Sequence, residues 1–218
     1  MIRSMPCEPA PWPQGAAHLP AALDAMSQAA LLAEVRQIIA EAPLYRPQMP
    51  RSGRPFSVLM TNCGTLGWVS DRSGYRYQEA HPQTGRRWPA IPQSLLQTWQ
   101  RLTAYPELPE ACLINYYAAA AKLGSHRDAD EEDVAAPVLS ISLGDTASFH
   151  VGGLARGDPK ASRLLHSGDI VILGGPARMA YHGIDRIEPG TSGLLAEGGR
   201  FNLTLRRVHR PLPCRPAY

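Results

Sequence analysis

The chain has 218 residues, 44% of them hydrophobic, and a formal net charge of +3 at pH 7, which fits one compact domain. It lacks an apolar run near the roughly 20 residues that cross a bilayer. It also lacks a basic and then apolar leader, so we expect a cytoplasmic protein without a membrane partner. The spacing of the four cysteines excludes a disulfide scaffold, and we expect them to be reduced. They are Cys7, Cys63, Cys112 and Cys214.

The first part of the chain predicts a flexible segment followed by a helix. Residues 1–20 hold five prolines and few large apolar residues, so we expect no fixed structure there. Helical apolar spacing over 27–41 predicts a packing helix with Ser27 as its N-cap. A second helix is expected to begin near Pro92. Its expected packing residues are Leu95, Trp99 and Leu102.

Short strands separated by Gly and Pro make up most of the remaining chain. They predict a mainly β protein with flanking helices, an α+β arrangement around a double-stranded jelly roll. We expect one domain over 21–209, with the jelly-roll core at 111–208 and a tail at 210–218. The predicted strands cover residues 56–61, 112–117, 138–143, 147–151, 163–165, 169–173, 179–184 and 201–208.

The segment from about 45 to 90 combines positive charge with aromatic residues. From Arg46 to Arg87 it has seven arginines against two acidic residues. Proteins that bind single-stranded nucleic acids use this composition for phosphates and bases. A solvated arginine-rich surface with ordinary core aromatics explains it equally well. The aromatic residues are Tyr45, Trp68, Tyr75, Tyr77 and Trp88.

The pair His126-x-Asp128 and the later His182 form a candidate metal site. Residues two apart at a strand edge point to the same face, and we expect His182 to come from a strand on the opposing side. Two imidazoles and one carboxylate are the ligand set of open non-heme Fe(II) sites. Taken singly, each histidine is more often a satisfied core or surface residue. We assign that role to His18, His81, His150, His166 and His209.

A second pattern follows, in which polar residues alternate with apolar ones over 200–206. This alternation predicts one strand, with its apolar face packed on the protein. A buried polar face with two guanidiniums needs a compensating negative charge, which a dicarboxylic acid would supply. Exposure of that face to water is the alternative. The polar residues are Arg200, Asn202, Thr204 and Arg206.

Many short motifs in order resemble the bacterial AlkB-type DNA repair dioxygenases, which are iron(II) and 2-oxoglutarate enzymes of the jelly-roll class. The resemblance runs from about Pro43 to Arg207 and includes both polar patterns. It is carried by Met60-Thr61-Asn62-Cys63-Gly64, Leu66-Gly67-Trp68, Pro89-Ala90-Ile91-Pro92-Gln93-Ser94, Leu113-Ile114-Asn115-x-Tyr117, Ser140-Ile141-Ser142-Leu143-Gly144, Gly152-Gly153-Leu154 and Tyr181-His182-Gly183-Ile184.

The resemblance implies a reaction and a cosubstrate site. Iron(II) is expected on His126, Asp128 and His182, with 2-oxoglutarate and O2 as cosubstrates. Loss of CO2 from 2-oxoglutarate, giving succinate, is coupled to hydroxylation of a methyl group on a base nitrogen, and the product breaks down to formaldehyde and the repaired base. The residues expected to hold 2-oxoglutarate are Asn115, Tyr117, Arg200, Asn202 and Arg206.

The same resemblance implies a base pocket. Trp68 is expected to stack the base against the ring of His126, because stacking on aromatic side chains holds unpaired bases. Asp130, and with it Glu131, is expected beside the cationic methylated base. Tyr75 and Arg156 are expected to touch the substrate strand or the base edge, with a structural salt bridge as the alternative for Arg156.

Four residues depart from the familiar family pattern and leave the substrate preference open: Thr65, Asp71, Val151 and Leu173. The expected substrate is DNA with 1-methyladenine or 3-methylcytosine, preferably single-stranded because the target base must leave the stack. The same chemistry on RNA or protein is one alternative. A non-catalytic jelly-roll binding module is another, and it predicts a missing metal ligand. We expect a monomer.

Overall fold

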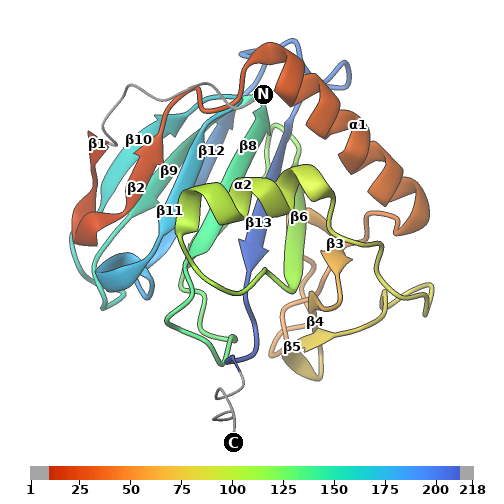
Figure 1. Ribbon diagram of the computed structural model, residues 1–218. Coiled ribbons are helices and arrows are strands. Elements are labelled where there is room, and N and C mark those ends of the chain that lie inside the picture. Colours follow the sequence, from red (N-terminus) through yellow and green to blue (C-terminus); the bar gives the residue numbers. More distant parts are fainter. Residues whose placement is uncertain (1–9, 212–218) are drawn as a thin grey trace, which may run out of the picture.

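Two antiparallel sheets face each other and form the expected jelly roll (Figure 1). The computed structural model describes residues 10–211. The seven-stranded sheet has the order β1-β2-β11-β8-β13-β6-β3, and the four-stranded sheet has the order β10-β9-β12-β7. The strands are β1 (Ala10–Pro11), β2 (Ala17–Leu19), β3 (Leu59–Gly64), β4 (Gly67–Asp71), β5 (Gly74–Gln78), β6 (Ala111–Tyr117), β7 (Leu123–His126), β8 (Val138–Gly144), β9 (Thr146–Val151), β10 (Ala161–Leu165), β11 (Ile170–Leu173), β12 (His182–Glu188) and β13 (Arg200–Arg206).

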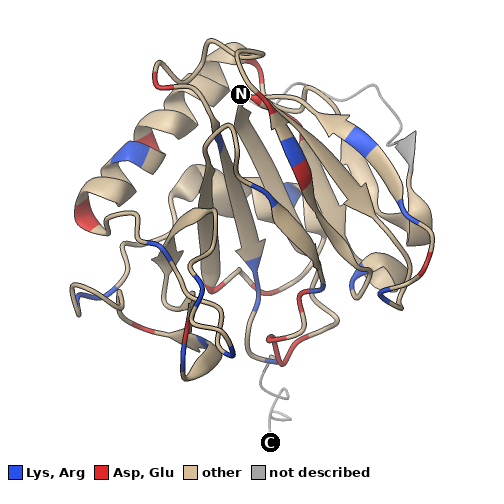
Figure 2. Cartoon of the chain, turned by 180° about the vertical axis from the view of Figure 1, so that it is seen from behind, with Lys and Arg blue, Asp and Glu red and all other residues tan. Residues whose placement is uncertain are grey.

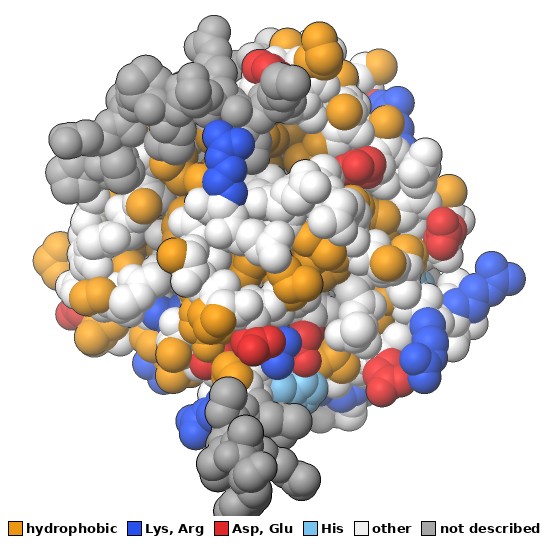
Figure 3. Space-filling view, viewed as in Figure 1, with side chains coloured by type: hydrophobic (Ala, Val, Ile, Leu, Met, Phe, Trp, Pro, Cys, Tyr) orange, Lys and Arg blue, Asp and Glu red, His pale blue; other side chains and the backbone are white. Residues whose placement is uncertain are grey.

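Two helices, α1 (Ala25–Glu41) and α2 (Gln93–Thr103), cover the outer face of the larger sheet (Figure 1). Their apolar residues pack in one core with the apolar face of β13, as the alternating pattern predicted. The opposite face of β13 therefore points between the two sheets. On the helix face of the molecule, charged side chains lie scattered among apolar and uncharged ones (Figure 3). Neither helix has the length and apolarity that would carry it across a membrane.

The first helix begins earlier than predicted. Asp24, not Ser27, is its N-cap, because the Asp24 carboxylate accepts a 2.8 Å hydrogen bond from the backbone N–H of Ser27. The second helix follows Pro92 as expected, with Leu95 and Trp99 buried. Apolar spacing predicted both helices. It could not decide between two capping residues, because that choice depends on where the chain enters the helix.

The N-terminal segment differs from the expected flexible chain. Strand β2 pairs with β11, and Trp12 is buried against the smaller sheet with its indole N–H donating to the carbonyl of Ala161. Apolar burial of Trp12 thus offsets the conformational freedom of a proline-rich segment. The rest of the expected flexible ends, residues 1–9 and 212–218, lies outside the described residues.

Several strands differ from the predictions. The strand predicted at 179–184 is displaced to β12, because a turn binds the backbone of Ala180 to Ala177 just before it. The hairpin of β4 and β5 and the short β7 were not predicted, since they are polar and glycine-rich. The hairpin forms its own two-stranded sheet beside the jelly roll and lies within the arginine-rich segment (Figure 1).

Candidate metal centre

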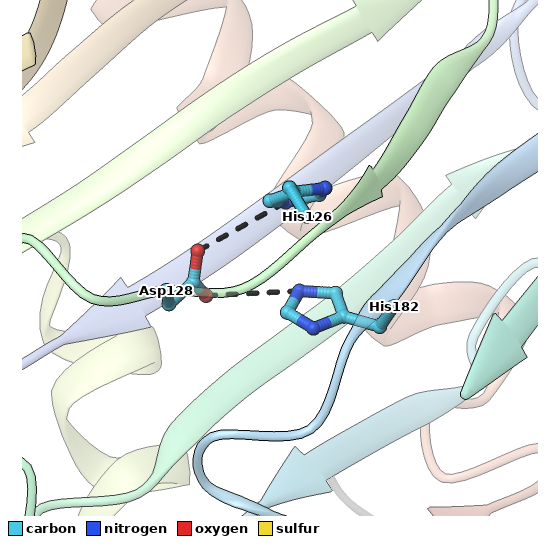
Figure 4. Close-up of side chains that lie close together, drawn as sticks. All are labelled: His126, Asp128 and His182. Carbon is cyan, nitrogen blue, oxygen red and sulfur yellow. Dashed lines mark ion pairs between the residues drawn. The ribbon is translucent and has the colours of Figure 1, made fainter. Parts of the chain in front are cut away.

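The two histidines and the aspartate of the first motif meet at one end of the smaller sheet (Figure 4). His126 is the last residue of β7 and His182 the first of β12, and the two are paired across these neighbouring strands. The prediction that His182 comes from the opposing side is therefore wrong. Gly183 permits this pairing, because a Cβ there would lie 2.6 Å from the carbonyl oxygen of Leu123 on β7.

The ligand atoms are close enough for one ion. The Nε2 atoms of His126 and His182 lie 3.9 and 3.8 Å from the two carboxylate oxygens of Asp128, and one ligand atom from each residue lies within 4.8 Å of the others. Among residues 10–211, these three residues form the group of His, Cys, Asp or Glu side chains that is close enough to hold a metal ion. It leaves coordination positions open, as catalytic iron sites do.

Backbone carbonyls orient both rings. Nδ1 of His126 lies 3.0 Å from the carbonyl oxygen of Gly124, and Nδ1 of His182 lies 3.0 Å from that of Ala180. Because a carbonyl only accepts, each Nδ1 carries the proton and each Nε2 presents its lone pair toward Asp128. The sequence spacing gave no sign of these carbonyl contacts.

The charges at the centre suit a cation. Burial alone would raise the pKa of Asp128, but Arg206, His182 and His126 outweigh it and hold that pKa below its ordinary value. Burial, together with His126, lowers the pKa of His182 to about 4. One oxygen of Asp128 accepts a 2.7 Å bond from Arg206, and the other, Oδ2, is buried without a hydrogen-bond partner. A metal ion would satisfy that orphaned oxygen.

A cavity of about 860 Å³ extends from the metal centre between the two sheets. The β13 residues Asn202, Thr204 and Arg206 line it, together with Asn115 and Tyr117 of β6. Oδ1 of Asn115 and Nε of Arg206 are buried without hydrogen-bond partners. The cavity therefore offers an amide, a phenol and a guanidinium to an acidic ligand, and their binding of 2-oxoglutarate stays a prediction.

Arg200 lies apart from this group and does not line the cavity. It is fully buried, and it donates to the carbonyls of Asp145 and Leu165 and to the hydroxyl of Ser142. Its Nε has no partner, and burial lowers its pKa to about 10. Its role toward 2-oxoglutarate, which the resemblance implies, stays a prediction.

Glu131 is also placed differently from expectation. It is buried against Arg178 at 3.0 Å and accepts a short hydrogen bond from the Tyr77 hydroxyl, instead of lining the cavity beside a base. Arg178 in turn donates to the carbonyl of Asp128 at 2.7 Å. Neither Arg178 nor Tyr77 was assigned a site role from the sequence, because no spacing links them to the metal motif.

The outer part of the cavity is aromatic. Trp68 stacks on Tyr75 with ring centroids 5.4 Å apart, and its indole N–H donates to Asp130 at 2.8 Å. Arg156 lies over the ring of Tyr181 and donates to the carbonyl of Ser125, so the salt bridge considered for it is not what holds it. All of these residues line the cavity with His126.

The arginine-rich segment divides into two parts. Its Tyr45 and Trp88 are core residues, whereas Trp68 and Tyr75 line the cavity. Seen from behind, Lys and Arg residues lie along the loops around the β4 and β5 hairpin (Figure 2). Some are engaged in ion pairs, as Arg76 is with Asp71 at 2.8 Å. The core-aromatic interpretation is confirmed for Tyr45 and Trp88, and nucleic-acid binding by the rest of the segment stays a prediction.

The four departing residues lie in different surroundings. Thr65 is exposed, Asp71 pairs with Arg76, Val151 is buried in the core, and Leu173 lines the cavity. The histidines expected to be structural have protein partners instead of metal-site neighbours, namely Asp169 for His18, Pro43 for His81, Asp185 for His150, Thr146 for His166 and Glu110 for His209. Cys63 and Cys112 are free thiols, and Cys7 and Cys214 lie outside the described residues.

A jelly roll with two histidines and one aspartate at the edge of a cavity between its sheets defines the class of non-heme iron oxygenases. The family described as the 2OG-Fe(II) oxygenase superfamily matches residues 15–206, and the chain belongs to it. It is 51% identical to an alpha-ketoglutarate-dependent dioxygenase AlkB homolog of Caulobacter vibrioides over 87% of this chain and 86% of the relative. Identity to the Escherichia coli dioxygenase AlkB is 44%, over 82% and 83%. The solved structure of OsALKBH1 superposes with a TM-score of 0.76 at 30% identity, covering 88% of this chain and 98% of that one.

The protein is thus an iron(II) and 2-oxoglutarate dioxygenase. When bound, the iron with its cosubstrates 2-oxoglutarate and O2 supplies an oxidation coupled to the decarboxylation of 2-oxoglutarate. The chain supplies the surroundings: His126, Asp128 and His182 would hold the metal, and Arg206, Asn202 and Tyr117 would hold the acid. Because Arg206 is buried, its charge-assisted bond to the acid would be stronger than in water.

Proposed function

We propose that this dioxygenase removes methyl groups from the ring nitrogens of bases such as 1-methyladenine and 3-methylcytosine in DNA, preferably single-stranded. Hydroxylation of the N-methyl group gives an unstable hydroxymethyl product, which releases formaldehyde and the repaired base. Succinate and CO2 are the other products. The observation that carries this proposal is the stacked pair Trp68 and Tyr75, which lines the same cavity as the metal ligands.

The geometry of the mouth supports a flipped base as the substrate. A base that enters the cavity would meet Trp68 and Tyr75 on the way to His126, and stacking on such rings contributes about 1 to 3 kcal/mol per base. Asp130 supplies a carboxylate beside them, which favours a base that methylation has made cationic. A base already unpaired reaches the cavity without the cost of breaking its stack.

Positive charge around the cavity favours a polynucleotide over a free base. Lys122, Arg127 and Arg156 line the cavity and would meet the phosphates on either side of the target. This arrangement serves RNA as well as DNA, so RNA is the second candidate substrate. The binding-module alternative required a missing metal ligand, and all three ligands are in place. We also propose that the enzyme is a cytoplasmic monomer.

The test is product release from protein loaded anaerobically with Fe(II) and 2-oxoglutarate and then given oxygen. Matched oligonucleotides would carry one 3-methylcytosine in single-stranded DNA, duplex DNA or RNA, with unmethylated strands as controls. We expect formaldehyde from the methylated strands alone and at the highest rate from single-stranded DNA. Faster release from RNA would move the substrate to RNA, and succinate without formaldehyde on every strand would refute nucleic-acid demethylation.

A further inference from the structure

Four buried charged side chains interlock beside the metal ligands. Arg206 donates to Asp128 at 2.7 Å and lies 3.6 Å from Glu131. Arg178 donates to Glu131 at 3.0 Å and to the carbonyl of Asp128 at 2.7 Å. All four side chains are buried. We call them the charge cluster, and its two carboxylates balance its two guanidiniums.

Glu131 is the member of the charge cluster that the metal and 2-oxoglutarate do not explain. Its carboxylate is buried and turned away from the cavity, where it contacts Arg178, Arg206 and the hydroxyl of Tyr77. Burial of an ionised carboxylate is costly unless it is paired and fully hydrogen-bonded. Glu131 meets that condition through partners that themselves touch Asp128.

We propose that Glu131 and Arg178 are positioning residues whose balanced charges set the relative affinity of the centre for its cation and its anion. Glu131 and Asp128 both contact Arg206, so Glu131 offsets part of the positive charge that Arg206 would present to an acidic ligand. Arg178 fixes the backbone of Asp128 without entering the cavity. Together they keep the cluster neutral until the metal ion and the 2-oxoglutarate dianion bind.

Electrostatics gives this proposal a signature that loosening of the structure would not produce. Removing the charge of Glu131 leaves the cluster with one net positive charge. In a site shielded from water, that charge repels a divalent cation and attracts a dianion. The two affinities therefore change in opposite directions, whereas a disordered metal loop would weaken both.

The experiment compares the wild-type protein with Glu131→Gln, which keeps the side-chain shape. Mn(II) serves as the metal probe, because its free ion is counted by electron paramagnetic resonance. Binding of 2-oxoglutarate to Mn(II)-saturated protein is then measured by calorimetry without oxygen. We expect Mn(II) to bind about tenfold more weakly and 2-oxoglutarate about tenfold more tightly. Weakening of both affinities, or a change in neither, would overturn the proposal.

Two acidic neighbours provide matched controls. Glu132 is exposed in the same loop, and Asp133 is buried there but bonded to the hydroxyl of Tyr105. Glu132→Gln and Asp133→Asn should leave the ratio of the two affinities unchanged, even where Asp133→Asn lowers the melting temperature. Glu131→Asp retains the charge and should return both affinities to within about threefold of the wild-type values.

A second variant covers the case in which Glu131→Gln does not fold. Arg178→Gln removes the opposite charge, so the signs reverse: 2-oxoglutarate should bind about tenfold more weakly and Mn(II) no more weakly than in the wild-type protein. Weaker Mn(II) binding with unchanged 2-oxoglutarate binding would contradict the proposal. These measurements need no nucleic acid, so their outcome is independent of the proposed substrate.

Discussion

The inner and outer ends of the cavity differ in how their side chains are held. At the inner end, Asp128 and Arg206 are buried in the charge cluster and fixed by ion pairs. At the outer end, Trp68 is partly exposed and Tyr75 is 51% exposed; their rings stack, and the Trp68 indole donates to Asp130. The difference indicates a division of work, in which the inner end fixes the chemistry and the outer end selects the substrate.

The largest effect should follow from removing the metal carboxylate. Asp128→Ala leaves two histidines and removes the 2.7 Å partner of Arg206, so turnover should fall by about a thousandfold or more. Formaldehyde release and Mn(II) binding check this, with circular dichroism to verify that the variant is folded. Normal activity in this variant would remove the iron assignment altogether.

Arg206→Lys tests whether the inner guanidinium holds the cosubstrate. A lysine keeps the charge but loses the two-pronged geometry that matches a carboxylate. We expect kcat/KM for 2-oxoglutarate to fall about a hundredfold, measured by succinate release at saturating oligonucleotide. KM for the oligonucleotide should stay within about threefold. If only KM for the oligonucleotide changed, Arg206 would belong to the outer, substrate-binding end of the cavity instead of the inner end.

Trp68→Ala tests the outer end. Loss of about 1 to 3 kcal/mol of stacking should raise the Kd for a methylated oligonucleotide about tenfold, while the affinity for 2-oxoglutarate stays unchanged. Trp68→Phe, which keeps an aromatic face, should recover most of the binding. Fluorescence anisotropy of a labelled strand under anaerobic conditions measures both. Equal binding by the wild-type protein and the alanine variant would mean that the stacked pair is structural.

Asp130→Asn should change selectivity more than rate. The amide can still accept from the indole of Trp68 but no longer attracts a cationic base. We expect the preference for 3-methylcytosine over its neutral counterpart, cytosine, to fall about fivefold in competition binding. An undiminished preference would show that charge recognition lies elsewhere.

The smallest effect on turnover is expected far from the cavity. Asp169 joins β2 to the jelly roll by accepting from Ala21 and His166 and pairing with His18. Burial would raise the pKa of Asp169, but these bonds hold it below its ordinary value of 3.8. The stabilisation that the Asp169 carboxylate provides is therefore present above pH 3.8, and it is lost as the pH falls through the lowered pKa.

Asp169→Asn should lower the free energy of unfolding at neutral pH by about 1 to 3 kcal/mol, with turnover at 25 °C unchanged. Urea unfolding of both proteins between pH 7 and pH 3 measures the difference, which should shrink toward the acidic end. A difference that stays constant with pH would show that the carboxylate charge plays no part.

The sequence predicted the parts of this molecule that a spacing encodes. The alternating β13 is such a case, because strand geometry converts a period of two into a shared face. Asp128 lies two residues past the end of β7 and still reaches the same site as His126. Glu131 was predicted at the base and is instead buried against Arg178. Arg178 carries no periodic signal, and its contacts come from residues more than forty positions away.

The same limit explains the errors of the fold prediction. Trp12 lies among prolines, and local composition could not show that it would find a place against Phe149 of the smaller sheet. The pairing of His182 with His126 in one sheet depended on the strand order, which no local pattern contains. The helices could be predicted without long-range information, because apolar spacing along each helix already indicates its buried face.

One cavity is proposed to join the oxidation of 2-oxoglutarate to the removal of a methyl group from a base. The most direct test measures succinate and formaldehyde together in one reaction of the wild-type enzyme with single-stranded DNA carrying 3-methylcytosine. We expect equal amounts of the two products and no formaldehyde from the unmethylated strand. If metal-loaded protein released neither succinate nor formaldehyde, the proposed demethylation would be refuted.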